Sequence, residues 1–210
     1  MKKIKLWIVL ITGILVLLGS CAKDDDDDSS TTTSITSTSA SGSITVGSET
    51  LSGTYASPCT TSNVSIFAAL GYYPSDVKSV RSVIVVTGDS AFSDENYYYS
   101  DTECSEISTY IIDGLSSVTI GDATGSNYKV SYTETSFKLK ANTTAAETFW
   151  ETSLQNAGLN ADLTVGEEYT ATSNSAYYSL WYVTSSTIQT GTESESAYPT
   201  SVSTTVYTKQ

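Results

Sequence analysis

Apolar and polar positions alternate along most of the chain from Ile44 onward. The apolar positions are rich in β-branched and aromatic residues, which favour half-buried strands, and Gly, Asp, Asn and Ser separate the runs. The pattern predicts strands at 44–46, 51–55, 82–87, 97–99, 107–112, 118–120, 128–133, 137–140, 177–183, 187–189 and 202–208, with turns at 88–89, 113–114, 121–122 and 125–127. Many short strands of this kind predict an all-β fold, an antiparallel barrel with a β-sandwich as the alternative.

One segment in the second half has helical spacing instead. Thr144-Ala145-Ala146-Glu147 has the form of a capping box, and Gly158 followed by Leu159 has the form of a helix stop. We therefore expect an amphipathic helix over 145–157 that packs against the sheet, with Trp150 in the core. Residues 67–70 could form a second, short helix. The apolar positions that recur at helical spacing are Ala146, Phe149, Trp150, Leu154 and Ala157.

The first residues have the pattern of an export signal. Three Lys lie within residues 1–5, and an apolar run follows from Leu6 to Leu18. A helix of this length reaches about 20 Å, which is short of the roughly 30 Å hydrocarbon core of a bilayer. The run is therefore interpreted as the apolar region of a signal peptide rather than a membrane span.

The residues after this run resemble a known motif. Leu18-Gly19-Ser20-Cys21 is similar to the lipobox of bacterial lipoproteins, in which the Cys carries diacylglycerol and the signal is cut before it. The resemblance implies a signal peptide of residues 1–20 and a membrane anchor on Cys21, where acyl chains would hold the protein firmly. The alternative is an ordinary signal peptide with a Cys there by chance.

Residues 21–43 have the composition of a disordered tether. Asp24 to Asp28 are consecutive, and 12 of the 15 residues from Ser29 to Ser43 are Ser or Thr. An acidic run after the lipidated Cys resembles surface-export signals of outer-membrane lipoproteins in Bacteroidetes-like bacteria. Ala22 stands where an Asp causes inner-membrane retention in enterobacteria. These resemblances imply an outer-membrane location, on either face, and leave residues 44–210 as the folded domain.

Composition excludes several kinds of function. The formal charge is -13 and the chain has no His. Excess negative charge disfavours nucleic acid as a partner. Without His there is no Ser-His-Asp triad and no Cys-His pair. We therefore expect a non-catalytic protein without a cofactor or bound metal.

Two cysteines remain after Cys21. Cys59 and Cys104 are 45 positions apart. Exported proteins meet an oxidising compartment, so the sequence predicts a disulfide between them, with two buried free thiols as the alternative.

Clusters of acids raise two further alternatives. A carboxylate-dependent hydrolase would need a convergent pair, and Ca²⁺ would need several oxygens in one loop. We expect most of these acids to be solvated at the surface. The hydrolase candidates are Asp94–Glu95, Asp101/Glu103/Glu106 and Glu167–Glu168, and the calcium candidates are Asp89, Asp94, Glu95 and Asn96.

The chain holds 15 Tyr and 4 Phe. Consecutive Tyr at 72–73, 97–99 and 177–178 would place one ring inward and another toward solvent, since neighbours on a strand point to opposite faces. Exposed Tyr suits a surface adhesion or protein/glycan-interaction module. The simpler interpretation is that Tyr is frequent here because it favours β-strands.

Gly53-Thr54-Tyr55 resembles the Gly-x-Trp start of the first strand in lipocalins and related calycin barrels, with Tyr in place of Trp. A helix near the C-terminus followed by a last strand is also similar to that family. The resemblance implies eight strands closed around a small apolar ligand. The leading expectation is a lipid-anchored cell-envelope protein that binds such a ligand.

Overall fold

The structure is a computed structural model that describes residues 36–210. The predicted signal peptide 1–20, Cys21 and the acidic run at 24–28 lie outside the described residues. None of the helices within 36–210 has the length and apolar character that crossing a bilayer requires.

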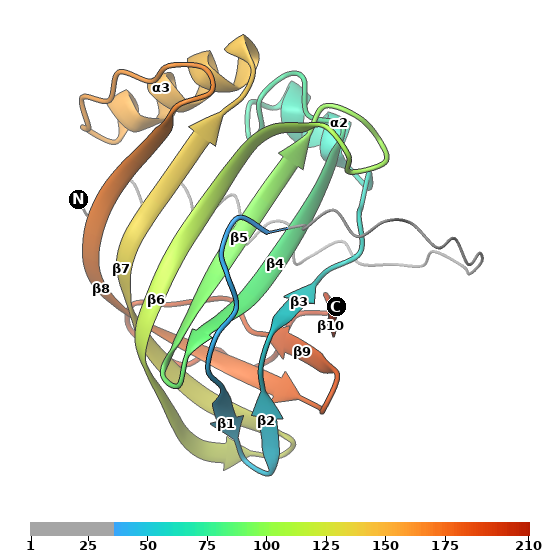
Figure 1. Cartoon of the computed structure of the whole chain (residues 1–210), viewed down its shortest axis with the longest axis vertical. Coiled ribbons are helices and arrows are strands. Elements are labelled where there is room, and N and C mark those ends of the chain that lie inside the picture. The colour runs from blue at the N-terminus through green and yellow to red at the C-terminus, as the bar shows by residue number, and fades with distance from the viewer. Residues whose placement is uncertain (1–35) are drawn as a thin grey trace.

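Eight strands form one antiparallel sheet that closes into a ring (Figure 1). Neighbours in sequence pair from β3 to β9, and β10 lies between β9 and β3 and completes the ring. The all-β prediction is confirmed, and the sandwich alternative, which needs two facing sheets, does not describe this single sheet. The strands are β3 (Thr54–Ala56), β4 (Ser79–Gly88), β5 (Ala91–Tyr99), β6 (Ile107–Thr124), β7 (Asn127–Ala141), β8 (Glu168–Val183), β9 (Thr187–Thr190) and β10 (Tyr207–Lys209).

Two strands are longer than the sequence predicts. β6 runs through the segments predicted as separate strands at 107–112 and 118–120, so the predicted turns at 113–114 and 121–122 are wrong. Register shifts near Gly114 and Ser117 absorb the irregular residues without ending the pairing with β7. A Cβ at Gly114 would meet Ser136 Oγ, so the Gly leaves room for this hydroxyl where β6 and β7 approach each other. β7 likewise joins 128–133 and 137–140, with a register shift at Thr135.

The predicted strand at 51–55 is divided in two. β1 (Ile44–Val46) and β2 (Glu49–Leu51) form a separate hairpin, and β3 begins after a break at Gly53, whose φ is +84°. Only Gly adopts this backbone conformation readily. The hairpin lies at the end of the ring opposite the helices (Figure 1), with Ile44, Val46 and Leu51 buried.

The two described helices lie at the other end of the ring (Figure 1): α2 (Val64–Ala69) and α3 (Thr144–Asn156). The predicted helix at 145–157 is confirmed within a residue, but its N-cap is Thr143 rather than Thr144. The Thr143 side chain accepts a hydrogen bond from the Ala146 N–H. At the other end, Gly158 N–H donates to the Gln155 carbonyl and Leu159 N–H to the Leu154 carbonyl, which is the stop that the sequence predicts.

The apolar core has two parts inside the ring. The helix-end cluster includes Phe67 and Trp150; Trp150 is 2% exposed, so its predicted core position is confirmed. The hairpin-end cluster includes Tyr55, Phe92 and Trp181, and Phe92 packs edge-to-face on Trp181 with ring centroids 5.2 Å apart. The part of the interior between the two clusters belongs to neither of them.

The predicted disulfide joins Cys59 and Cys104, whose Cα atoms are 6.0 Å apart. It ties the segment after β3 to the loop between β5 and β6.

Candidate functional site

Carboxylates point into the ring between the two apolar clusters. On β5, Phe92 and Tyr98 belong to the hairpin-end and helix-end clusters, so Asp94 between them shares their inward face. Asp94 lies directly opposite Asp113 of β6, and Glu134 of β7 lies opposite Leu115 of the hairpin-end cluster. Three adjacent strands thus each direct one acid inward.

A fourth acid enters from the segment after β9. Gly191 N–H donates to the Leu180 carbonyl at 2.6 Å, and Tyr178 and Ser194 exchange two backbone hydrogen bonds, so this segment extends along β8. Glu193 lies within it and accepts a hydrogen bond from the Tyr132 hydroxyl. We call the set Asp94, Asp113, Glu134 and Glu193 the acidic belt.

Tyrosines connect the members of the acidic belt. Burial raises the pKa of Tyr98, and the charges of Tyr73, Asp113 and Asp94 raise it further. Burial followed by Glu193 raises the pKa of Tyr132. Burial also raises the pKa values of Tyr177 and Tyr207, and Glu134 is the first acid acting on Tyr177 and Asp94 the first on Tyr207. Each belt carboxylate therefore lies close enough to a buried phenol to act on it.

The pKa of Asp94 is strongly raised. Burial, followed by the negative charges of Glu193 and Glu95, raises the pKa of Asp94 to about 8. Its Oδ1 is inaccessible and has no hydrogen-bond partner. The hydroxyl of Tyr98, a residue 1% exposed, is also buried without a partner. Buried polar atoms are normally paired, so two unsatisfied groups on the same inner face need an explanation.

Other inward side chains at this level are partly exposed. Ser82 of β4, Asp113 of β6 and Ser175 of β8 are of intermediate exposure although their register places them inside the ring. On β8 the pattern is regular, since residues 171, 173 and 175 are intermediate and 172, 174 and 176 are exposed. Solvent therefore reaches the polar middle of the interior.

The outer face of β4 and β5 is covered. Glu95 is fully buried there and accepts hydrogen bonds from Ser93, Tyr97 and Thr36 at 2.9, 2.5 and 2.5 Å. Thr36 belongs to the segment 36–43, and Ser41 N–H of that segment also donates to the Val86 carbonyl. Residues 36–43 therefore pack against β4 and β5.

The three consecutive tyrosines at 97–99 do not present a ring to solvent. Tyr97 and Tyr99 point outward but are 2% and 3% exposed, so the expectation of a solvent-facing ring at 97–99 is wrong. Tyr72 and Tyr178 are half-buried, and no Tyr within 36–210 is in the exposed class.

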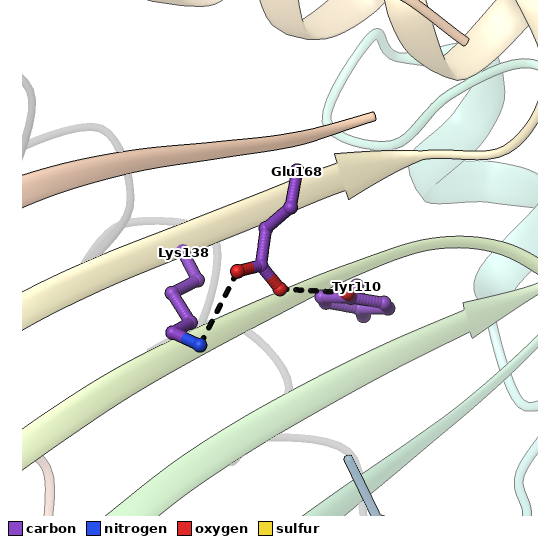
Figure 2. Close-up of polar contacts among 3 residues, drawn as sticks. All are labelled: Tyr110, Lys138 and Glu168. Atoms are coloured by element: carbon purple, nitrogen blue, oxygen red, sulfur yellow. Dashed lines mark hydrogen bonds and ion pairs between the residues drawn. The ribbon is translucent and has the colours of Figure 1, made fainter. Parts of the chain in front are cut away.

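A small polar network lies on the outer face of β6, β7 and β8 (Figure 2). Lys138 Nζ is 3.2 Å from Glu168 Oε1, and the Tyr110 hydroxyl donates to Glu168 Oε2 at 2.9 Å. Burial followed by Glu168 raises the pKa of Tyr110 to about 12. A pair this accessible contributes little stability and faces away from the interior, so we assign it no site.

The acid pairs singled out in the sequence do not converge. Asp94 and Glu95 lie on opposite faces of β5, and Glu167 and Glu168 are exposed at the start of β8. Asp101 instead organises its own loop by accepting from Ser105 and Glu106, and these bonds, Ser105 first, lower its pKa. Glu103 and Glu106 are exposed in that loop.

The calcium candidates are also separated. Asp89 lies in the turn between β4 and β5 and accepts from the Ser43 N–H at 3.2 Å. Asp94 and Asn96 point inward on β5, whereas Glu95 points outward. Within residues 36–210, no three His, Cys, Asp or Glu are grouped to hold a metal ion.

Sequence reasoning missed Asp113, Glu134 and Glu193. Asp113 precedes Gly114, and the Asp-Gly pair predicts a turn. Its spacing of two from Ile111 and from Leu115, both buried in the ring, is the signal that would have placed it inward. Glu193 had no such signal because it follows the last regular alternation of its region.

No protein-family model matches this chain, and no curated protein is significantly similar to it.

Proposed function

We propose that the chain is a lipid-anchored lipoprotein of the bacterial outer membrane whose domain is a non-catalytic barrel that binds a small ligand in its interior. The anchoring half rests on the basic start, the short apolar run and the lipobox-like Leu18-Gly19-Ser20-Cys21. The binding half rests on the middle of the ring.

The observation that carries the binding proposal is the pair of unsatisfied groups, Asp94 Oδ1 and the Tyr98 hydroxyl, in an interior that solvent reaches. A buried polar group without a partner costs roughly 1–3 kcal/mol. A ligand that pairs with both groups would recover this free energy. Binding sites of this kind have apolar walls and a few placed polar groups, which matches the two apolar clusters around the acidic belt.

The calycin likeness supports the proposal in outline. Tyr55, of the Gly-x-aromatic step, is fully buried at the start of the ring, and Lys209 Nζ lies 5.9 Å from its ring centroid. The element order departs from the resemblance, because three strands rather than one follow α3. The likeness therefore supports a barrel architecture and carries no ligand identity.

The interior favours a ligand with a polar group over a wholly apolar one. A wholly apolar ligand would leave Asp94 Oδ1 and the Tyr98 hydroxyl without hydrogen-bond partners, which is costly. The alternative of an adhesion surface built from Tyr has less support, since the described tyrosines are buried or half-buried.

Anchoring is tested by Cys21→Ala in the full chain. The parent should appear in the membrane fraction with an acylated N-terminal Cys21 by mass spectrometry, and the variant should be neither cleaved after Ser20 nor acylated. Cys59→Ala/Cys104→Ala, which removes the disulfide and keeps Cys21, should be cleaved and acylated as the parent is. Identical processing of the parent and Cys21→Ala would refute the anchor.

Interior binding is tested with neighbouring residues on opposite faces of β8. Ser175 points inward and Ala176 is exposed on the outer face. Isothermal titration with benzylammonium, benzyl alcohol and phenylacetate should show one-to-one binding of at least one probe. Ser175→Phe should abolish that binding, whereas Ala176→Phe should leave it intact. Binding by none of the three probes, or equal binding by both variants, would refute an interior site.

A further inference from the structure

The acidic belt concentrates negative charge at one level of the interior. Its four carboxylates come from β5, β6, β7 and the segment after β9, which are far apart in sequence but meet inside the ring. Arg81 of β4 and Lys129, Lys138 and Lys140 of β7 alternate to the outer face, and the exposed Lys209 of β10 lies opposite Tyr55 of the hairpin-end cluster. The strands that build this level therefore contribute acids and no bases to it.

This arrangement raises the free energy of the ionised belt. The pKa of Asp94, raised by burial first and then by Glu193 and Glu95, reports that cost. A cation bound beside Asp94 would offset both the burial and the repulsion, whereas a neutral ligand would offset neither. Charge therefore favours a cationic ligand.

The two unsatisfied atoms favour a ligand that carries hydrogen-bond donors as well as a positive charge. Asp94 Oδ1 is an acceptor, and the Tyr98 hydroxyl oxygen, which lies near Asp94 and Asp113, is another. A protonated amine has N–H groups that donate to both. A quaternary ammonium has the same charge but no N–H, so it would leave both atoms unpaired.

Aromatic rings border the same level. Tyr132 lies 5.1 Å from Phe92 and 6.3 Å from Tyr177, measured between ring centroids. Ring faces attract cations and cover hydrocarbon, so they suit an ammonium group on an apolar body. A metal ion would instead need several oxygens converging on one point, and the described acids form no such group.

We propose that the interior selects a small protonated primary amine, with the ammonium donating to Asp94 and the Tyr98 hydroxyl and the carbon body lying against the aromatic side chains around Phe92. This inference rests on the proposed interior site and narrows its ligand class.

Isothermal titration of the purified full chain tests the ligand class. Benzylammonium, benzyl alcohol, benzyltrimethylammonium and phenylacetate share one aromatic body and differ in charge and N–H donors. Benzylammonium should bind at least about tenfold more tightly than each of the others, because hydrogen bonds to charged groups contribute about 1.5–3 kcal/mol.

Three variants test the assigned residues. Asp94→Asn and Tyr98→Phe should each weaken benzylammonium binding, Asp94→Asn by about tenfold or more. Asp89→Asn removes the same charge from the exposed turn and should leave binding unchanged. Thermal unfolding of each variant checks that the domain is folded, and Asp94→Asn is expected to fold because Asn has nearly the same shape as Asp and carries no charge to bury.

The outcomes separate the two proposals. If benzyl alcohol or phenylacetate binds in the interior as tightly as benzylammonium, the amine inference is wrong and the interior site stands. If benzyltrimethylammonium binds as tightly as benzylammonium, or if Asp94→Asn binds benzylammonium as tightly as the parent does, donation to Asp94 is refuted. Binding by no probe at all removes both proposals.

Discussion

Asp94 couples the folded state to protons. Its pKa of about 8 in the folded protein lies well above the ordinary value of about 3.9, so between these values the folded protein holds a proton that the unfolded chain has released. Its contribution to stability is therefore complete below the unfolded pKa and is lost as the pH rises through about 8. Glu193, Glu95 and Asp113 are the charged groups that face or influence it.

Replacing Asp94 by Asn should remove this dependence. The parent should lose about 3 kcal/mol of unfolding free energy from this group between about pH 5.5 and pH 8, and Asp94→Asn should have a flatter pH profile and be more stable at pH 8. The absence of His keeps other side chains with ordinary pKa values from titrating in this window. Urea unfolding at both pH values measures the difference. A parent and variant with parallel pH profiles would contradict the raised pKa.

At the residue scale, local signals were predictable and long-range ones were not. The Gly158 stop depends on the immediate backbone, and the burial of Trp150 on helical spacing, so both could be inferred from sequence. The inward direction of Asp113 depends on pairing with Asp94 of another strand, and Asp-Gly also occurs in turns. Pairing between strands assembles most of the candidate site, so most of the site could not be predicted from the sequence.

At the scale of elements, the strands were found but their ends were misplaced. β6 continues through Asp113-Gly114 because Gly114 allows β7 to approach at Ser136 and neighbouring register shifts absorb irregular residues. A dipeptide that ends a strand in one context is thus tolerated inside a longer one when both neighbouring strands pair through it.

The start of α3 provides a test with two adjacent threonines. Thr143 accepts from the Ala146 N–H and donates to Asp76 Oδ2 at 2.8 Å, whereas Thr144 is exposed. Thr143→Ala should lower the unfolding free energy by about 1 kcal/mol or more, and Thr144→Ala should change it by less than about 0.5 kcal/mol. Urea unfolding measures both. The reverse order would show that Thr144 is the cap.

The disulfide stabilises the connection between two loops. It closes a separation of 45 residues, for which the loop-entropy relation gives about 4 kcal/mol. Cys59→Ala/Cys104→Ala should lower the unfolding free energy by up to that amount. Reductant should lower the unfolding free energy of the parent to the level of the variant and leave the variant unchanged. A variant as stable as the oxidised parent would mean that the bond adds nothing to the fold.

For the whole molecule, the ring depends on a three-residue strand. β10 pairs with β3 through Thr208–Ala56 and Lys209–Tyr55, and with β9 on its other side. The short alternating runs predicted an all-β fold, because period and composition are local. The closure itself could not be predicted. Of the predicted strand at 202–208, only Tyr207 and Thr208 belong to β10, and Lys209 follows them.

Breaking one backbone hydrogen bond of this closure should be severe. Lys209 N–H donates to the Ser186 carbonyl at 2.8 Å. Lys209→Pro removes that donor and should cost about 3 kcal/mol or more, whereas Lys209→Ala keeps it and should cost about 1 kcal/mol or less. Thermal and urea unfolding measure both variants. Equal losses would indicate that the Lys side chain over Tyr55, rather than the strand pairing, secures the closure.

The pairing of β3 with β10 also sets when the domain can fold. β3 and β10 leave the ribosome far apart in time because they lie near opposite ends of the domain sequence. Contacts between residues so far apart in sequence form slowly. A nascent chain that has not yet made β10 cannot pair it with β3 and stays unfolded, which is the state that passes through a translocation channel. For an exported protein, late closure would postpone folding until the chain has reached the compartment where Cys59 and Cys104 can be oxidised.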